Sequence, residues 1–135
     1  MPNLNSIYRP TWAEVNLNNL AFNFKQIKKL LEPQTKVMAC VKSDAYGHGL
    51  VPIAKKLQAL NADFLGVATL EEAITLRKDG ISLPILILGL IQKKDIKLLF
   101  KYRLRPTVCS EDFGYALNKK AARKNITFRI HIKID

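Results

Sequence analysis

Short runs of apolar residues alternate along the chain with longer segments whose apolar residues recur every three or four positions. The runs begin near residues 37, 64, 85, 106 and 128, at intervals of 27, 21, 21 and 22 residues. A continuous apolar run is typical of a buried strand, and the longer spacing indicates an amphipathic helix. Repeated strand-and-helix units predict parallel strands in an α/β fold, either an open doubly wound sheet or a barrel.

Residues that favour helix ends mark the boundaries of the predicted helices. Thr69 and Glu72 form a capping box at the start of one helix, and Gly80 supplies the left-handed stop after it. Ser110 caps a later helix, and residues 93–100 form a short one between the two.

The amino-terminal part predicts a strand followed by a helix. Apolar and polar side chains alternate regularly enough over residues 12–17 to predict a short strand. Asn16 or Asn18 can cap the helix that follows. That helix ends at Glu-Pro, residues 32–33. Its apolar face consists of Leu20, Phe24, Ile27 and Leu31.

The last predicted strand, residues 128–135, alternates strictly between apolar and polar side chains. The apolar set is Phe128, Ile130, Ile132 and Ile134, and the polar set is Arg129, His131, Lys133 and Asp135. On an open sheet such alternation is typical of an exposed edge strand. In a barrel the apolar set would pack outward on helices and the polar set would point inward, with Lys133 and Asp135 near the catalytic mouth.

The composition indicates a folded protein and argues against membrane and nucleic-acid partners. The chain has 135 residues, of which 48% are apolar, and no segment approaches the roughly 18 apolar residues of a membrane helix. The amino terminus lacks the features of a signal peptide, which predicts a cytoplasmic protein without a membrane partner. The net charge of +11 is spread over the exposed faces of predicted helices, and no nucleic-acid-binding motif accompanies it, so no nucleic-acid partner is expected.

The cysteines and histidines suggest no metal or disulfide chemistry. Cys40 and Cys109 lie far apart inside apolar segments, which predicts two buried free thiols in a reducing compartment. The two histidines lie on separate predicted elements with no cysteine or carboxylate at ligand spacing, so no metal site is expected. A Gly-x-Ser-x-Gly turn is absent, which argues against a serine nucleophile.

The chemistry of the chain is concentrated after the strand predicted over residues 37–41. Lys42 follows that strand directly, then comes Ser-Asp-Ala-Tyr-Gly-His-Gly, and a helix begins at Leu50. The carboxyl end of a strand is where α/β sheets and barrels hold their active sites. Burial lowers the pKa of such a lysine, and its neutral amine can form a Schiff base with a carbonyl compound such as pyridoxal phosphate. The alternative is a lysine that merely extends from the strand end into solvent.

Residues 39–49 resemble the cofactor-lysine segment of the alanine racemases, whose pattern is roughly Val-Val-Lys-Ala-Asn/Asp-Ala-Tyr-Gly-His-Gly. The departures are mainly Cys40 and Ser43, both small residues in place of small residues. The Thr-Trp-Ala-Glu-Val-Asn-Leu-Asn-Asn-Leu opening, residues 11–20, and the His-Ile-Lys-Ile-Asp end, residues 131–135, are also similar to that family. The resemblance implies a (β/α)8 TIM barrel accompanied by a β domain.

The resemblance also implies the roles of three residues. Lys42 would bind pyridoxal 5'-phosphate covalently and exchange the α-proton on the D-alanine side. Tyr46 would place its hydroxyl on the cofactor phosphate, with packing beneath the turn as the alternative. Lys133 would be carbamylated, as in many members. His48 receives no catalytic role from the resemblance, and holding the turn is favoured over lining the pocket.

A complete barrel needs about 250 residues, so the resemblance implies an amino-terminal portion whose end at Asp135 looks like a cut. Residues 1–17 would be a strand belonging to a missing β domain, and residues 18–135 the first part of a cofactor-binding barrel with about five strands. The second catalytic base and most phosphate ligands would lie outside this chain. The portion alone is therefore predicted to be inactive and to associate.

The function implied by the resemblance is alanine racemase, which interconverts L-alanine and D-alanine for peptidoglycan synthesis in the bacterial cytoplasm as a homodimer. Two alternatives stay open. One is an amino-acid racemase of broader specificity, since the residues that select the substrate would lie in the missing half. The other is a non-catalytic barrel protein that binds pyridoxal phosphate.

Overall fold

Five parallel strands lie side by side in chain order within residues 12–134, the part of the chain that the computed structural model describes. They are β1 (Met38–Cys40), β2 (Phe64–Val67), β3 (Ile85–Ile87), β4 (Arg105–Val108) and β5 (His131–Ile132). Cys40 pairs with Gly66, and Gly66 pairs with Leu86, so the first three strands end at one edge of the sheet. The predicted parallel α/β arrangement is confirmed.

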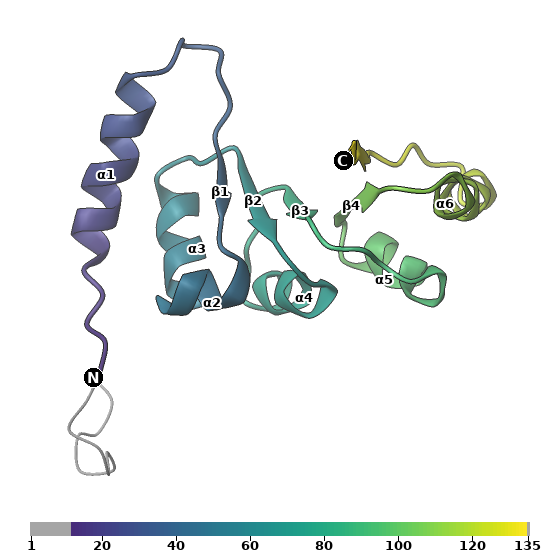
Figure 1. The fold of residues 1–135 in the computed structure, drawn as a ribbon, viewed down its shortest axis with the longest axis horizontal. Coiled ribbons are helices and arrows are strands. Elements are labelled where there is room, and N and C mark those ends of the chain that lie inside the picture. Colours follow the sequence, from purple (N-terminus) through teal and green to yellow (C-terminus); the bar gives the residue numbers. More distant parts are fainter. Residues whose placement is uncertain (1–11, 135) are drawn as a thin grey trace.

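At least one helix precedes each strand in the chain, and the helices follow the outer side of the curved row of strands (Figure 1). They are α1 (Leu17–Lys29), α2 (Lys42–Gly47), α3 (Leu50–Ala59), α4 (Leu70–Lys78), α5 (Ile96–Lys101) and α6 (Glu111–Arg123). A 3-10 turn, η2 (Lys93–Asp95), precedes α5, so the helix predicted over residues 93–100 is divided in two. Strands curving inside a layer of helices form part of a (β/α)8 barrel, as predicted.

The core lies between the strands and the helices. Alternate strand residues enter it, among them Leu65 and Val67 of β2 and Ile85 and Ile87 of β3, all fully buried. The helices contribute residues spaced three or four apart, for example Ile53 and Leu57 of α3. The sheet is therefore closely packed on its outer face, and this packing fixes the position of each strand end.

The inner face of the sheet is more open, which corrects two predictions. Met38 and Cys40 of β1 are exposed, so the strand expected to be buried on both faces is covered on one only. Cys40 and Cys109 are free thiols as predicted, but both are exposed instead of buried. The five strands do not close into a complete barrel. An apolar strand sequence alone cannot show whether another layer covers the inner face of the sheet.

Three polar or aromatic side chains meet on this inner face. The guanidinium carbon of Arg105 lies 4.6 Å from the ring centroid of Phe64. The ring of His131 meets the same phenylalanine edge-on, with centroids 6.3 Å apart. The inward direction expected of His131 in a barrel is therefore observed.

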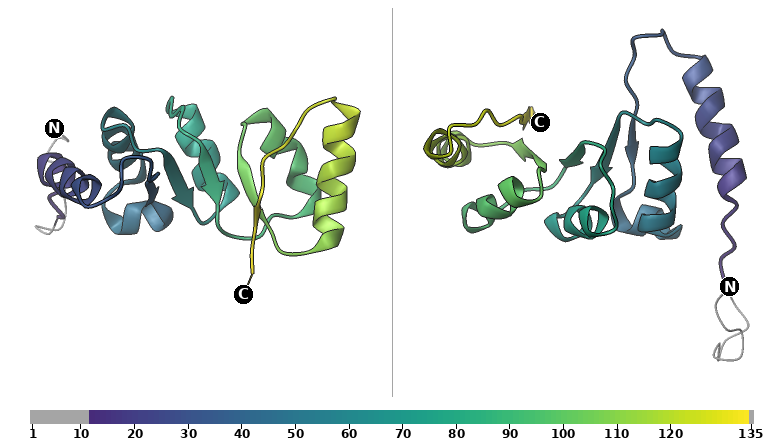
Figure 2. Two further views of the ribbon diagram at one scale, coloured as in Figure 1. Left: turned by 90° about the horizontal axis from the view of Figure 1, so that it is seen from above. Right: turned by 180° about the vertical axis from the view of Figure 1, so that it is seen from behind.

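The apolar residues of the last strand only partly follow the prediction. Phe128 packs on Phe100 of α5 with ring centroids 4.6 Å apart, but Ile132 and Ile134 are 74% and 93% exposed. The segment after α6 returns along the sheet to the end of the chain (Figure 2). Only two of its residues form regular pairs with β4. Asp135 lies outside the described residues.

The strand predicted over residues 12–17 is not formed. Residues 12–16 have no regular structure and α1 begins at Leu17, capped by Asn16, whose Oδ1 accepts the N–H groups of Asn18 and Asn19 at 2.9 and 3.2 Å. A strand needs a partner, and none pairs with this segment among the described residues. Its assignment to a β domain stays a prediction, and residues 1–11 lie outside the description. On α1, Phe24 is buried as expected, whereas Ile27 is 52% exposed.

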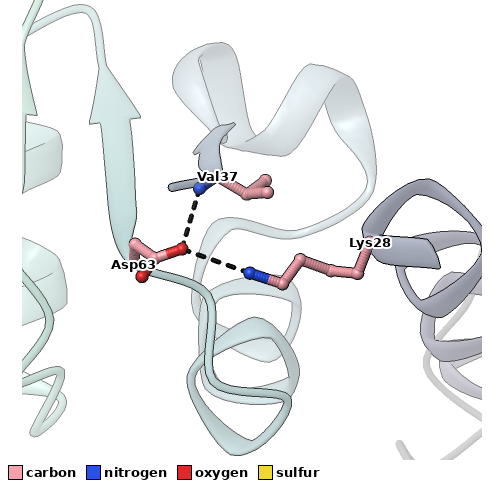
Figure 3. Close-up of polar contacts among 3 residues, drawn as sticks. All are labelled: Lys28, Val37 and Asp63. Carbon is pink, nitrogen blue, oxygen red and sulfur yellow. Dashed lines mark hydrogen bonds and ion pairs between the residues drawn. The ribbon is translucent and has the colours of Figure 1, made fainter. Parts of the chain in front are cut away.

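An aspartate connects α1 to the start of the sheet (Figure 3). Oδ2 of Asp63 accepts the backbone N–H of Val37 at 2.8 Å and lies 3.5 Å from Nζ of Lys28. The hydrogen bond from Val37, followed by the charge of Lys28, lowers the pKa of Asp63 below its ordinary value despite an opposing effect of burial. The carboxylate thereby joins a helix and two strands at the amino ends of β1 and β2.

Candidate active site

Lys42 lies at the carboxyl edge of the sheet. β1 ends at Cys40, the fully buried Val41 follows, and Lys42 is the first residue of α2. Its side chain is half-buried, and Nζ lies 6.0 Å from the ring centroid of Tyr46. The structure thus brings together two of the three residues that the sequence singles out. The lysine lies at the edge where parallel α/β folds hold their active sites.

The residues after the lysine form a left-handed helical turn. Ser43, Asp44, Ala45 and Tyr46 have φ between 52° and 55° and ψ between 38° and 53°. A left-handed helix costs roughly 1–2 kcal/mol per non-glycine residue, because Cβ crowds the following carbonyl oxygen. Four such residues in succession persist only when surrounding contacts determine them, and strain of this kind concentrates at functional sites. The turn places Tyr46 beside the lysine amine.

Local hydrogen bonds hold both ends of the turn. Oδ1 of Asp44 accepts the N–H of Leu50 at 2.6 Å, which caps the first turn of α3. Nδ1 of His48 lies 2.9 Å from the carbonyl oxygen of Ala45, so the ring closes the turn as a donor. Gly49, with φ of 93°, makes the bend between α2 and α3. The hydrogen bond of His48 supports the turn-holding role favoured from the sequence.

A further constraint on the turn comes from the next βα unit. Oε1 of Glu72 accepts the N–H of Ser43 at 2.5 Å. Its other oxygen accepts the N–H groups of Ala68 and Thr69 at 2.8 and 3.2 Å. The capping box with Thr69 is formed as predicted, but the bond to Ser43 is a connection that the sequence analysis missed. One carboxylate therefore fixes the start of α4 and the backbone next to Lys42.

Lys133 also lies at the carboxyl ends of the strands, but at the other end of the strand order from Lys42. It directly follows β5, and its N–H donates to the carbonyl oxygen of Val108 at 2.9 Å. Because β1 and β5 are the outermost strands of the described sheet, three strands separate Lys133 from Lys42. The role of each of the three residues stays a prediction.

Residues 12–134 contain no group of three or more histidine, cysteine or acidic residues placed to hold a metal ion. They also contain no helix long and apolar enough to cross a bilayer.

The curved parallel sheet, its outer helices and a lysine at the carboxyl end of the first strand place the chain in the class of (β/α)8-barrel proteins. Residues 15–135 match the family model described as "Alanine racemase, N-terminal domain". The chain belongs to this family.

Individual relatives agree with the family model. An alanine racemase of Halothermothrix orenii is 47% identical over 129 residues, which are 96% of this chain and 34% of that protein. The solved alanine racemase of Clostridium difficile 630 has a TM-score of 0.89 and 42% identity, covering 96% of this chain and 34% of that one. A histidine racemase of Leuconostoc mesenteroides subsp. sake is more distant, with a TM-score of 0.75 and 27% identity over 84% of this chain and 30% of that one. This chain thus spans about a third of the length of its relatives.

Proposed function

We propose that this chain supplies the cofactor-lysine portion of an alanine racemase, which interconverts L-alanine and D-alanine with pyridoxal 5'-phosphate. The observation that carries the proposal is the half-buried Lys42 just after the carboxyl end of β1, with Nζ 6.0 Å from the ring centroid of Tyr46. The names of the relatives, at 41–47% identity over most of this chain, support the reaction class.

The residues at this edge fit the cofactor chemically. An aldehyde needs an amine that is not held by a carboxylate, and among the described residues Lys42 takes part in no ion pair. A phosphate needs donors, and the hydroxyl of Tyr46 lies on a side chain that is 59% exposed beside the amine. Both side chains extend from a turn held by hydrogen bonds, so they start from a fixed backbone.

In this proposal each residue has a separate task. The amine of Lys42 holds the cofactor and moves a proton to and from the α-carbon on the D-alanine side. The hydroxyl of Tyr46 orients the cofactor phosphate. When bound, pyridoxal phosphate supplies the electron sink that makes the α-proton acidic. Glu72, Asp44 and His48 act as positioning residues, because their hydrogen bonds fix the turn.

The remaining parts of the function belong to the proposal as well. Lys133 would be carbamylated, and a second base would come from the part of the relatives that this chain does not span. The active protein would be a homodimer in the bacterial cytoplasm and would provide D-alanine for peptidoglycan.

Covalent labelling tests the role of Lys42. After incubation with pyridoxal phosphate and reduction with borohydride, a pyridoxyl group is expected on the peptide that contains Lys42. Lys42→Ala removes this label, whereas Lys119→Ala, an exposed lysine on α6, leaves it in place. A label spread evenly over surface lysines would contradict the assignment.

A broader substrate range is the second candidate, because the histidine racemase of Leuconostoc shares the fold over 84% of this chain. Its test is racemisation of L-alanine and L-histidine by the full-length protein, followed by chiral chromatography. A strong preference for alanine supports the first proposal, and comparable rates support the second.

A further inference from the structure

A hollow lies at the end of the sheet opposite Lys42. It is formed by the loop between α4 and β3 and by the loop between α5 and β4, beside the amino ends of those two strands. Its volume is about 460 Å³. The polar and aromatic side chains in its wall are Arg77, Ser82, Lys101, Tyr102, Arg103 and Arg105. Small-molecule sites in proteins commonly have volumes of about 300–1,000 Å³.

The charge of this wall is entirely positive. Four of its eight residues are basic, and none is acidic. Within residues 12–134 the ion pairs involve Lys28, Lys55 and Lys93, and none of the four basic residues of the wall. A second hollow shares Arg103 and Arg105 with the first and adds Arg129. Like charges gathered around one cavity repel each other, and a bound anion would relieve that repulsion.

The shape of the hollow is fixed by Arg77. Its guanidinium donates to four backbone carbonyl oxygens, those of Ile81, Leu83, Tyr102 and Arg103, at 2.6–3.2 Å. Four of its five N–H donors are used in this way, so Arg77 contributes charge and a rigid wall more than free donors. The half-buried Arg77 thus ties the loop between α4 and β3 to the loop between α5 and β4, where the other three basic residues lie.

The remaining basic side chains keep their donors available. Lys101 lies with Nζ 5.2 Å from the ring centroid of Tyr102, and Arg105 lies over Phe64. Arg103 is exposed. Among the described residues the side chains of these three cations donate to no carboxylate or carbonyl group. Burial, followed by the neighbouring charge of Arg129, lowers the pKa of Arg105, which agrees with a crowded cationic environment.

We propose that this hollow binds the phosphate or diphosphate group of a small anionic molecule, with Lys101, Arg103 and Arg105 as its ligands and Arg77 as its rigid wall. Two arginines favour this class of ligand, because a guanidinium matches a phosphate with two parallel hydrogen bonds. The site is separate from the proposed cofactor site, since the two lie at opposite ends of parallel strands. A ligand could therefore occupy the hollow while the cofactor occupies the proposed site at Lys42.

Calorimetric titration of the full chain with sodium pyrophosphate in about 0.15 M NaCl tests this inference, because salt at that concentration screens diffuse surface attraction. Saturable binding is expected at a single site. Arg103→Gln and Lys101→Gln should each weaken it about tenfold, the loss expected for one charge-assisted hydrogen bond. Both side chains are exposed, and neither substitution removes a hydrogen bond that holds the loops.

Two controls make the result specific. Lys29→Gln removes the same charge from the exposed end of α1 and should leave the affinity within about twofold of the parent chain. Lys42→Ala should also leave it unchanged, which separates this site from the proposed racemase site. Adenosine monophosphate in a parallel titration distinguishes a phosphate ester from an inorganic diphosphate. Absence of saturable binding, or an equal loss in Lys29→Gln and Arg103→Gln, would overturn the inference.

Discussion

The backbone N–H of Ser43 donates to Oε1 of Glu72 at 2.5 Å, across 29 positions of the sequence. This bond joins the residue next to Lys42 to the helix of the following βα unit. Because Oε2 of the same carboxylate accepts two further N–H groups, Glu72 connects three backbone positions. The orientation of the lysine turn therefore depends on a residue that lies outside the turn.

Replacing Glu72 with glutamine tests this dependence. An amide offers one acceptor oxygen and turns its NH2 group toward a backbone N–H, so at least one bond is lost. We expect the free energy of unfolding to fall by about 1–3 kcal/mol, and pyridoxyl labelling of Lys42 to fall with it. Glu71→Gln, at an exposed neighbour on the same turn of α4, should change both by little. Equal effects in the two variants, measured by urea unfolding and peptide labelling, would contradict the role of Glu72.

Asp63 should make the stability of the chain depend on pH in the acid range. Its pKa is lowered in the folded state by the hydrogen bond from Val37 and the charge of Lys28, from an ordinary value of 3.8. A carboxylate with a lowered folded pKa contributes its full stabilisation above the unfolded pKa, and this contribution is lost as the pH falls through the folded pKa. Urea unfolding between about pH 6 and pH 2 should therefore show a loss of stability below about pH 4.

Two variants separate the causes of this dependence. Asp63→Asn should remove this contribution to the pH dependence. Lys28→Met removes the ion pair but keeps the hydrogen bond from Val37, so most of the dependence should remain. If Lys28→Met abolished it as completely as Asp63→Asn, the ion pair and not the hydrogen bond would be the main cause.

Arg77 should stabilise the loops at the amino ends of β3 and β4 through the hydrogen bonds of its planar guanidinium more than through its positive charge. Its guanidinium reaches four carbonyl oxygens of two loops, and burial lowers its pKa, with a further contribution from Arg103. Arg77→Lys keeps the charge but cannot reproduce the planar fork, so we expect a loss of about 2–4 kcal/mol in the free energy of unfolding. Lys78→Ala, at the exposed neighbouring position, should cost less than about 0.5 kcal/mol.

Much of the fold could be predicted because its signals are local. Thr69 and Glu72 lie three residues apart, and the spacing of apolar residues in α3 depends only on its own sequence. The position of Lys42 followed from an apolar run and a helix start on either side of it. The family pattern added the barrel, since strand-and-helix spacing alone also fits an open sheet.

The conformation of the lysine turn could not be predicted from local preferences. Ser43, Asp44, Ala45 and Tyr46 include no glycine, yet all four adopt positive φ. The contact that helps to determine them comes from Glu72, 29 residues away from Ser43. The exposure of Cys40 is another case, because it depends on whether another layer covers the inner face of the sheet. Both features are set by tertiary contacts that residue type does not encode.

The exposed isoleucines at the end of the chain should make the 135-residue chain associate. Ile132 and Ile134 are 74% and 93% exposed beside β5, an outermost strand whose free edge can pair with another chain. Sedimentation is expected to show concentration-dependent assembly, and Ile132→Lys with Ile134→Lys should shift it toward the monomer by adding charge to that edge. Leu30→Lys, at an 86% exposed leucine after α1, adds charge away from the sheet edge and should leave assembly unchanged. A parent chain that sediments as a monomer and melts in a sharp, reversible two-state transition would refute this prediction.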